Sequence, residues 1–173
     1  MRDRLGREID YLRVSVTDRC NLRCRYCMPG GVPSVEHAEV LRYEELLRLC
    51  GLAVGLGIHA FKVTGGEPLV RRDCVSFLAE LKKLRGVEQV TLTTNGILLP
   101  DHLEALRTAG VDGINVSLDT LDDGLYSSLT GAPSGTAALV WRAAEASAAM
   151  GIHTKLNAVL LPETVEGIVE LTA

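Results

Sequence analysis

The sequence lacks the features that mark several large classes of protein. It has no block of basic residues and a formal net charge of −4, so a nucleic-acid-binding role is disfavoured. It has no apolar run long enough to span a bilayer and no secretory hydrophobic segment, so no membrane association is expected. It also has no internal repeat. The 173 residues, 47% of them hydrophobic, suit one domain with a sizeable core.

Cysteine is also scarce, and its distribution is uneven. Five cysteines are too few for the disulfide framework of a small secreted domain. Three of them nevertheless lie within eight residues, in the spacing C-x3-C-x2-C formed by Cys20, Cys24 and Cys27. Clustered free thiols without a secretion signal indicate a reducing compartment, so we expect a cytoplasmic location.

The three clustered cysteines indicate a metal centre. They follow a strand-like run at residues 12–16, and a loop at a strand end can direct several thiolates at one centre. Thiolates suit zinc or iron–sulfur clusters. A structural zinc site usually has four ligands in two pairs, whereas Cys50 and Cys74 stand alone in helix-like patterns. The spacing therefore favours a four-iron cluster with one open iron, and zinc stays open as the alternative.

Strand-like and helix-like segments alternate along the chain after a polar leader at residues 1–11. Asp73 is predicted to cap the second helix, and Asp101-x-x-Glu104 has the capping-box pattern for the third. The predicted strands lie at 12–16, 60–64, 87–93, 111–117 and 152–160. The predicted helices lie at 43–56, 73–86, 101–110, 136–150 and, as the start of a fifth, 163–171.

Five alternations of strand and helix predict an α/β fold with a parallel sheet. A doubly wound open sheet and a βα barrel both fit this order. An open sheet concentrates its site at one switch point, whereas a barrel collects it from the ends of many strands. Unusual residues follow four strands, in the cysteine loop and at 64–68, 93–96 and 117–119. This spread favours a barrel-like sheet of about five βα units.

The cysteine spacing after a first strand, with Tyr26 directly before the last cysteine, resembles the radical S-adenosylmethionine (SAM) superfamily. Within it, the run at residues 12–29 resembles the GTP 3',8-cyclase family of molybdenum cofactor biosynthesis, and the resemblance extends from about Leu5 to the end of the chain. That family continues with a further strand and with three cysteines for a second cluster. The resemblance therefore implies an incomplete barrel of the radical SAM type over residues 12–173.

The resemblance implies two cofactors, a [4Fe-4S] cluster on the three clustered cysteines and SAM on the open iron. An electron from a small-molecule or protein donor would cleave SAM, and the 5'-deoxyadenosyl radical would take a hydrogen atom from GTP, which then cyclises. The carboxylate of Glu67 would add an acceptor for the SAM amino group. The other implied SAM-binding residues are Tyr26, Gly66, Thr93 and Ser117.

Three cations within predicted strands are candidates for binding GTP. Arg13 and Lys155 would be unfavourable inside a barrel unless an anion pairs with them, and they could instead point outward to solvent. The resemblance implies GTP contacts for both and for Lys62, where the family carries Arg; Lys keeps the charge but loses the planar fork. Arg71 and Arg72, beside the second helix, are expected to be solvated.

Two other functions stay open beside GTP cyclisation. The chain could belong to another radical SAM enzyme, or it could be an inactive metal-binding fragment. The unpaired edge of the fifth strand predicts self-association, for example as a homodimer.

Overall fold

The computed structural model of the chain describes residues 2–27 and 39–172. Met28 and Pro29, the last two residues of the motif at 12–29, lie outside these ranges. Within the described residues, no helix is both long enough and apolar enough to cross a membrane.

Five parallel strands form one sheet, and their order in space is their order in the chain. The strands are β1 (Tyr11–Ser15), β2 (Ala60–Thr64), β3 (Gln89–Thr94), β4 (Gly113–Ser117) and β5 (His153–Asn157). In the described part of the chain the sheet does not close, and its order has no reversal of the kind that defines a doubly wound sheet. The predicted incomplete βα barrel is therefore confirmed.

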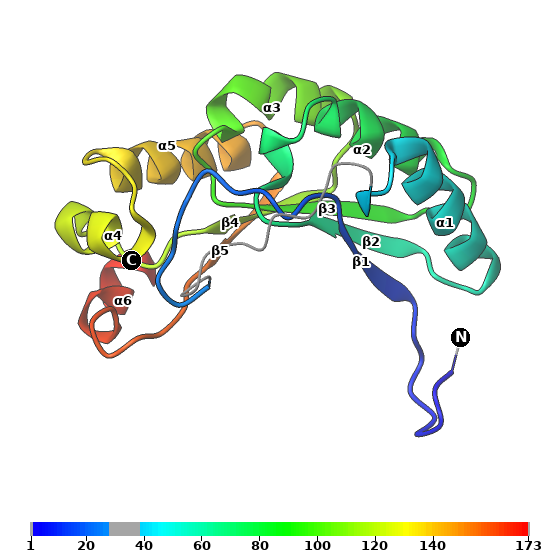
Figure 1. Cartoon of the computed structure of the whole chain (residues 1–173), viewed down its shortest axis with the longest axis horizontal. Coiled ribbons are helices and arrows are strands. Elements are labelled where there is room, and N and C mark those ends of the chain that lie inside the picture. Colours follow the sequence, from blue (N-terminus) through cyan, green and yellow to red (C-terminus); the bar gives the residue numbers. More distant parts are fainter. Residues whose placement is uncertain (1, 28–38, 173) are drawn as a thin grey trace.

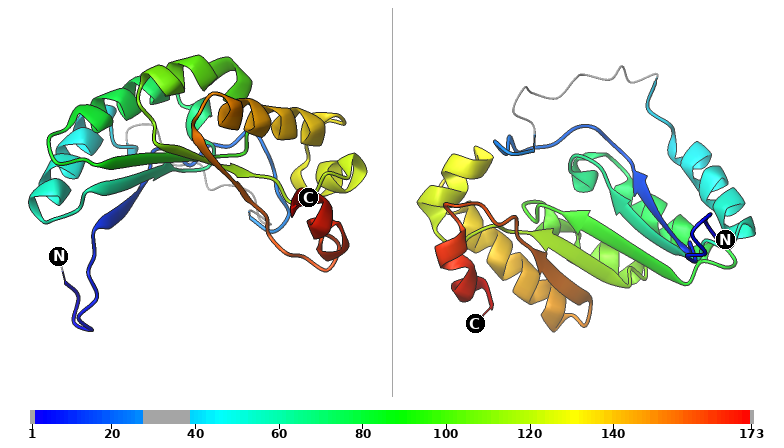
Figure 2. Two further views of the ribbon diagram at one scale, coloured as in Figure 1. Left: turned by 180° about the vertical axis from the view of Figure 1, so that it is seen from behind. Right: turned by 90° about the horizontal axis from the view of Figure 1, so that it is seen from below.

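Helices cover one face of this sheet (Figure 1), and no helix crosses the opposite face in the described part of the chain (Figure 2). The covering helices are α1 (Tyr43–Gly55), α2 (Cys74–Lys83), α3 (Leu99–Thr108) and α5 (Thr136–Ala149). Two shorter helices, α4 (Asp123–Thr130) and α6 (Ile168–Thr172), lie beyond the end of the sheet where β4 finishes. Two 3-10 segments of the described residues are η2 (Pro68–Val70) and η3 (Val165–Gly167).

The two faces of the sheet differ in their side chains. The face under the helices is apolar, and one buried row across it joins Val14, Val63, Leu92 and Ile114. Alternate residues of each strand point to the other face. The polar residues of that second face are Tyr11, Arg13, Ser15, Lys62, Thr64, Gln89, Thr91, Thr93, Asn115, Ser117, His153, Lys155 and Asn157. Burial of the first face against helices holds the fold together and leaves the second face available for a ligand.

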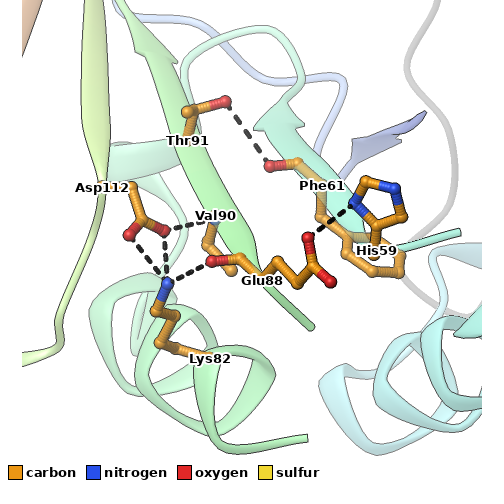
Figure 3. Close-up of polar contacts among 7 residues, drawn as sticks. All are labelled: His59, Phe61, Lys82, Glu88, Val90, Thr91 and Asp112. Atoms are coloured by element: carbon orange, nitrogen blue, oxygen red, sulfur yellow. Dashed lines mark hydrogen bonds and ion pairs between the residues drawn. The ribbon is translucent and has the colours of Figure 1, made fainter. Parts of the chain in front are cut away.

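Charged side chains link the strands to α2 at the N-terminal end of the sheet (Figure 3). Lys82 Nζ donates to Asp112 Oδ1 and Oδ2 at 2.7 and 2.6 Å and to the Glu88 carbonyl at 2.7 Å. Asp112 Oδ2 also accepts from the Val90 N–H at 2.6 Å. His59 Nδ1 lies 3.3 Å from Glu88 Oε2. Lys82 and Asp112 therefore compensate each other's charge at this end.

The predicted cap of α2 is right in its position but not in its hydrogen bond, and the predicted cap of α3 is wrong. Asp73 occupies the N-cap position of α2 in a left-handed conformation, with φ of 61°, but its side chain makes no capping hydrogen bond. Helix α3 begins at Leu99, with Pro100 in its first turn, so Asp101 already lies inside the helix. Proline is favoured in a first turn because it has no N–H to leave unpaired, and this moves the helix start two residues earlier.

Helix α4 is absent from the sequence-based prediction. Asp122 begins it by accepting the Leu125 N–H at 2.6 Å, and Gly131 ends it with a φ of 72°. Tyr126 and Leu129 bury its inner face. Eight residues give too short a stretch for helical periodicity to be recognised, although the aspartate at one end and the glycine at the other are ordinary helix signals.

Candidate active site

Residues 16–27, here called the cysteine loop, run from the end of β1 across the C-terminal end of the sheet to α4 (Figure 2). The Arg23 N–H donates to the Thr130 carbonyl at 2.8 Å, and the Arg25 N–H donates to the Leu129 carbonyl at 2.9 Å. The last carbonyls of a helix have no partner within it. The unpredicted helix α4 therefore anchors the middle of the cysteine loop.

The turn after β2 packs directly against the start of the cysteine loop. The Gly66 N–H donates to the Thr17 carbonyl at 2.7 Å, and the Glu67 N–H donates to the Arg19 carbonyl at 2.8 Å. A Cβ added to Gly66 would lie 2.2 Å from the Arg19 oxygen. Only glycine fits there, because two backbone segments meet at that point.

Glu67 joins the ends of β2 and β3. Its carboxylate is 0% exposed, and it accepts from the Leu69 N–H at 3.0 Å, from Thr94 Oγ1 at 2.8 Å and from the Asn95 N–H at 2.6 Å. Burial raises the pKa of this carboxyl above its usual value, and the hydrogen bonds oppose that shift. The expectation that Glu67 offers an acceptor to a bound amine is wrong, since its carboxylate is fully buried among donors of the protein itself.

Asn95, at the end of β3, reaches the first cysteine. Its Nδ2 donates to Asn21 Oδ1 at 2.7 Å and lies 3.8 Å from Cys20 Sγ. The same sulfur accepts the Leu22 N–H at 3.4 Å. From the sequence, Asn95 is only part of a turn signal, and nothing in the pattern identifies it as a neighbour of a cysteine.

Tyr26 fixes the other end of the cysteine loop. Its hydroxyl donates to Asp119 Oδ2 at 2.5 Å, and Asp119 Oδ1 accepts the Val159 N–H at 2.9 Å. Desolvation and the hydrogen bond to Asp119 raise the pKa of the Tyr26 phenol well above its usual value, so it remains a donor. Asp119 therefore holds the cysteine loop to the segment after β5. The one signal for it in the sequence is a carboxylate two residues past the end of β4.

A cavity of about 580 Å³ lies at this end of the sheet, within the range typical of ligand sites. It brings together seven of the eight residues that the sequence associates with the cluster or with SAM, and Glu67 is the exception. The seven are Cys20, Cys24, Cys27, Tyr26, Gly66, Thr93 and Ser117. Asn95, Asp119 and Asn157 also line it.

The three predicted GTP-binding cations are not in the described lining of this cavity but one layer deeper on the same polar face. Arg13 pairs in register with Lys62, and each lies two residues before the end of its strand. Lys155 lies two residues before Asn157, a spacing of about 7 Å along a strand. Among the described residues, no carboxylate forms an ion pair with any of the three. They lie on the face of the sheet away from the helices, and Lys62 Nζ also lies 5.9 Å from the centre of the Tyr11 ring.

The donor set fits a group larger than a single ion. Cys20 and Cys24 are partly buried and Cys27 is exposed, and all are free thiols. Within residues 2–27 and 39–172, no three His, Cys, Asp or Glu side chains converge as they would around one metal ion. A four-iron cluster takes one thiolate on each of several irons, so its ligands need not converge on one point. Cys50 and Cys74 are core residues, and burial raises their thiol pKa to about 11 and about 12.

Arg71 is only partly exposed and is bound by other parts of the chain, contrary to the expectation from sequence. Its guanidinium donates to the Val16 carbonyl at 2.5 Å and to the Leu41 carbonyl at 2.8 Å, and it lies 4.1 Å from the centre of the Tyr43 ring. Arg72 has a side chain that is 95% exposed, as expected. Arg71 therefore supports the start of the cysteine loop from behind.

Comparison with known proteins identifies the class to which this fold and site belong. A family model, the Radical SAM superfamily, matches residues 14–173. The chain therefore belongs to the radical SAM superfamily.

Within that superfamily, the chain is similar to the N-terminal portion of GTP 3',8-cyclases. The enzyme of that name from Heliobacterium modesticaldum is 50% identical over 163 residues, covering 93% of this chain and 49% of that enzyme. The one from Moorella thermoacetica is 46% identical, covering 92% of this chain and 50% of that enzyme. The chain thus spans about half the length of the curated relatives it matches.

Among solved structures, Streptococcus suis SuiB bound to S-adenosylmethionine is similar with a TM-score of 0.80. The identity is 24%, and the match covers 94% of this chain and 37% of that one. This likeness supports the fold alone.

Proposed function

We propose that this chain forms the cluster- and SAM-binding part of a GTP 3',8-cyclase of molybdenum cofactor biosynthesis. The observation that carries the proposal is one cavity lined by three clustered thiols, with unpaired cations on the sheet face below it. The similarity to GTP 3',8-cyclases supports the choice of substrate. In this proposal Cys20, Cys24 and Cys27 hold a [4Fe-4S] cluster.

The remaining lining residues would bind SAM. Thr93 and Ser117 present hydroxyls from the ends of β3 and β4, Gly66 keeps the turn after β2 close to the cysteine loop, and Tyr26 closes the side toward β5. When bound, the cluster and SAM would supply a 5'-deoxyadenosyl radical that takes a hydrogen atom from the substrate. The protein's own contribution is to hold both partners in place and to limit the access of water.

The cations would bind the triphosphate of GTP. Arg13, Lys62 and Lys155 share one face, and a polyanion would compensate charges that the described residues leave unpaired. Arginine binds phosphate through two parallel hydrogen bonds, whereas Lys62 offers only a point charge. The position of this layer below the cavity would put GTP on the sheet side of SAM.

The proposal also covers the cellular location, the electron donor and the oligomeric state. All five cysteines are free, which suits the cytoplasm, and a small molecule or a protein would donate the electron. The edge of β5 pairs with no further strand among the described residues, and we propose that this chain by itself associates at this edge as a homodimer. Sedimentation of the purified chain would test the dimer.

Anaerobic reconstitution with iron and sulfide tests the main proposal. Iron content is measured first, and then 5'-deoxyadenosine is measured with SAM and dithionite, with and without GTP. We expect a four-iron cluster, SAM cleavage and stimulation by GTP. A loaded cluster without SAM cleavage would favour the alternative of an inactive metal-binding fragment, and cleavage unaffected by GTP would point to another substrate.

Arg13→Ala separates the two halves of the proposed site. We expect it to weaken GTP binding by about tenfold, because a charge-assisted contact is lost, and to leave GTP-independent SAM cleavage unchanged. Arg85→Ala, at an exposed position outside the sheet, is the matched control. Equal losses of GTP binding and SAM cleavage in Arg13→Ala would mean that Arg13 is structural.

A further inference from the structure

The sulfur of Cys20 is contacted by N–H donors from two different parts of the chain. The Leu22 N–H, at 3.4 Å, belongs to the cysteine loop itself. The Asn95 amide, at 3.8 Å, comes from the end of β3, 75 positions along the chain. A strand of the rigid sheet therefore reaches this one thiol directly.

The orientation of the Asn95 amide is fixed by its other contacts. Its Oδ1 accepts the Ile97 N–H at 3.1 Å, and its Nδ2 donates to Asn21 Oδ1 at 2.7 Å. A flipped amide would set N–H against N–H and oxygen against oxygen. The backbone N–H of Asn95 donates to the buried carboxylate of Glu67 at 2.6 Å, which ties the residue to the core. The donor that faces Cys20 is therefore held in place.

We propose that Asn95 is a positioning residue that sets the reduction potential of the cluster through an N–H···S hydrogen bond to Cys20. The inference rests on the proposed function, in which Cys20 is a cluster ligand. A donor to a ligand sulfur stabilises the reduced cluster, which carries one more negative charge, and so raises the potential. Asn95 thus makes the cluster easier to reduce through its hydrogen bond to the ligand sulfur.

The test is the midpoint potential of the reconstituted protein without SAM, measured by a redox titration followed by electron paramagnetic resonance. Asn95→Asp keeps the acceptor for the Ile97 N–H but removes the donor and adds a negative charge. Asn157→Asp is the matched control, because it adds the same charge to the same cavity from the end of β5. Among the described residues, no hydrogen bond joins the Asn157 side chain to a cysteine sulfur. We expect the midpoint of Asn95→Asp to be clearly more negative than those of Asn157→Asp and the wild type.

A second, uncharged variant is measured in case Asn95→Asp binds the cluster poorly. Asn95→Leu removes the amide without adding charge, and its midpoint is expected between those of the wild type and Asn95→Asp. If Asn95→Asp holds less iron than Asn157→Asp, the inference is tested by comparing the midpoint potential of Asn95→Leu with that of the wild type. Equal midpoints for the two Asp variants, or a wild-type midpoint for Asn95→Leu, would overturn the inference alone. A wild-type chain that assembles no cluster would overturn the proposed function together with it.

Discussion

The two ends of the sheet differ in how they bind the carboxylate that joins neighbouring strands. At each end a carboxylate joins neighbouring strands, Asp112 at the N-terminal end and Glu67 at the C-terminal end. Asp112 is one-third exposed and pairs with Lys82, whereas Glu67 is fully buried and is bound only by neutral donors. The N-terminal end therefore compensates its own charges and contributes stability. The C-terminal end leaves thiols, hydroxyls and amides exposed to a cavity, as expected for the functional end of a βα barrel.

The largest effect expected is at the C-terminal end, from Cys24→Ala. Two remaining thiolates in the loop are too few to retain a four-iron cluster, so we expect almost complete loss of bound iron after reconstitution. Cys50→Ala, in the core, should keep the iron and lower the free energy of unfolding by about 1 kcal/mol. Iron assays and urea titrations of both variants check this contrast. Unchanged iron in Cys24→Ala would remove Cys24 from the proposed ligands.

The next largest effect is expected from Gly66→Ala. The added methyl group meets the Arg19 backbone oxygen, so the cysteine loop must move, and we expect unfolding to become easier by about 3 kcal/mol. Gly51→Ala is the control, because a Cβ there meets nothing within 4 Å and the position is helical. That control should stabilise the protein by about 0.5 kcal/mol. Similar stabilities for the two variants would show that the contact with Arg19 is unimportant.

Glu67→Gln tests the buried carboxylate itself. Glutamine cannot accept all three donors, and one unpaired buried N–H should lower the free energy of unfolding by about 2 kcal/mol. The pH dependence should also change. Since burial raises the pKa of Glu67 above 4.5, the native state binds more protons than the unfolded state between 4.5 and the raised pKa. Wild-type stability should therefore lose a contribution as the pH rises through that window.

Denaturant titrations at a series of pH values measure this slope. In Glu67→Gln the part of the slope due to this carboxyl disappears, while the remaining acids contribute as before. An identical pH slope in both proteins would show that Glu67 titrates in the folded state as it does in the unfolded chain.

The smallest effect is expected at the N-terminal end. Lys82→Met removes the partner of Asp112 but keeps the packing of the side chain, and we expect a loss of about 1 kcal/mol, since the pair is partly exposed. Lys83→Met, which breaks only a surface pair with Glu80, should have almost no effect. Bound iron and SAM cleavage should be unchanged in both. A loss of iron in Lys82→Met would contradict the comparison, in which the N-terminal end contributes stability and only the C-terminal end binds ligands.

Local patterns were sufficient to predict most of the fold. The five strands could be located because each combines apolar residues with a turn, and the residues past their ends indicated a barrel. Helix α4 could not be found in this way, since it is short and is packed against the cysteine loop through Thr130 and Leu129. The partners of Arg71 lie 55 and 30 residues away in the chain, so no local pattern predicts that it is built into the fold.

The site was predictable where a residue type is itself informative. Cysteines in a fixed spacing can be recognised from the sequence, and so can hydroxyls at strand ends, such as Thr93 and Ser117. Asn95 and Asp119 do not, because their roles depend on which part of the cysteine loop they meet in space. Glu67 was misjudged for a similar reason, since its burial follows from the approach of β3 and not from its own motif.

The strand order affects how the protein can fold while it is being synthesised on the ribosome. Each of the strands β2 to β5 pairs with the strand synthesised just before it. Its partner is therefore already present when it leaves the ribosome. The loops to be closed between partners are single crossovers, and short closures lose less chain entropy than long ones. Folding can therefore begin at β1 during translation, with each newly docked strand becoming the edge on which the next one pairs.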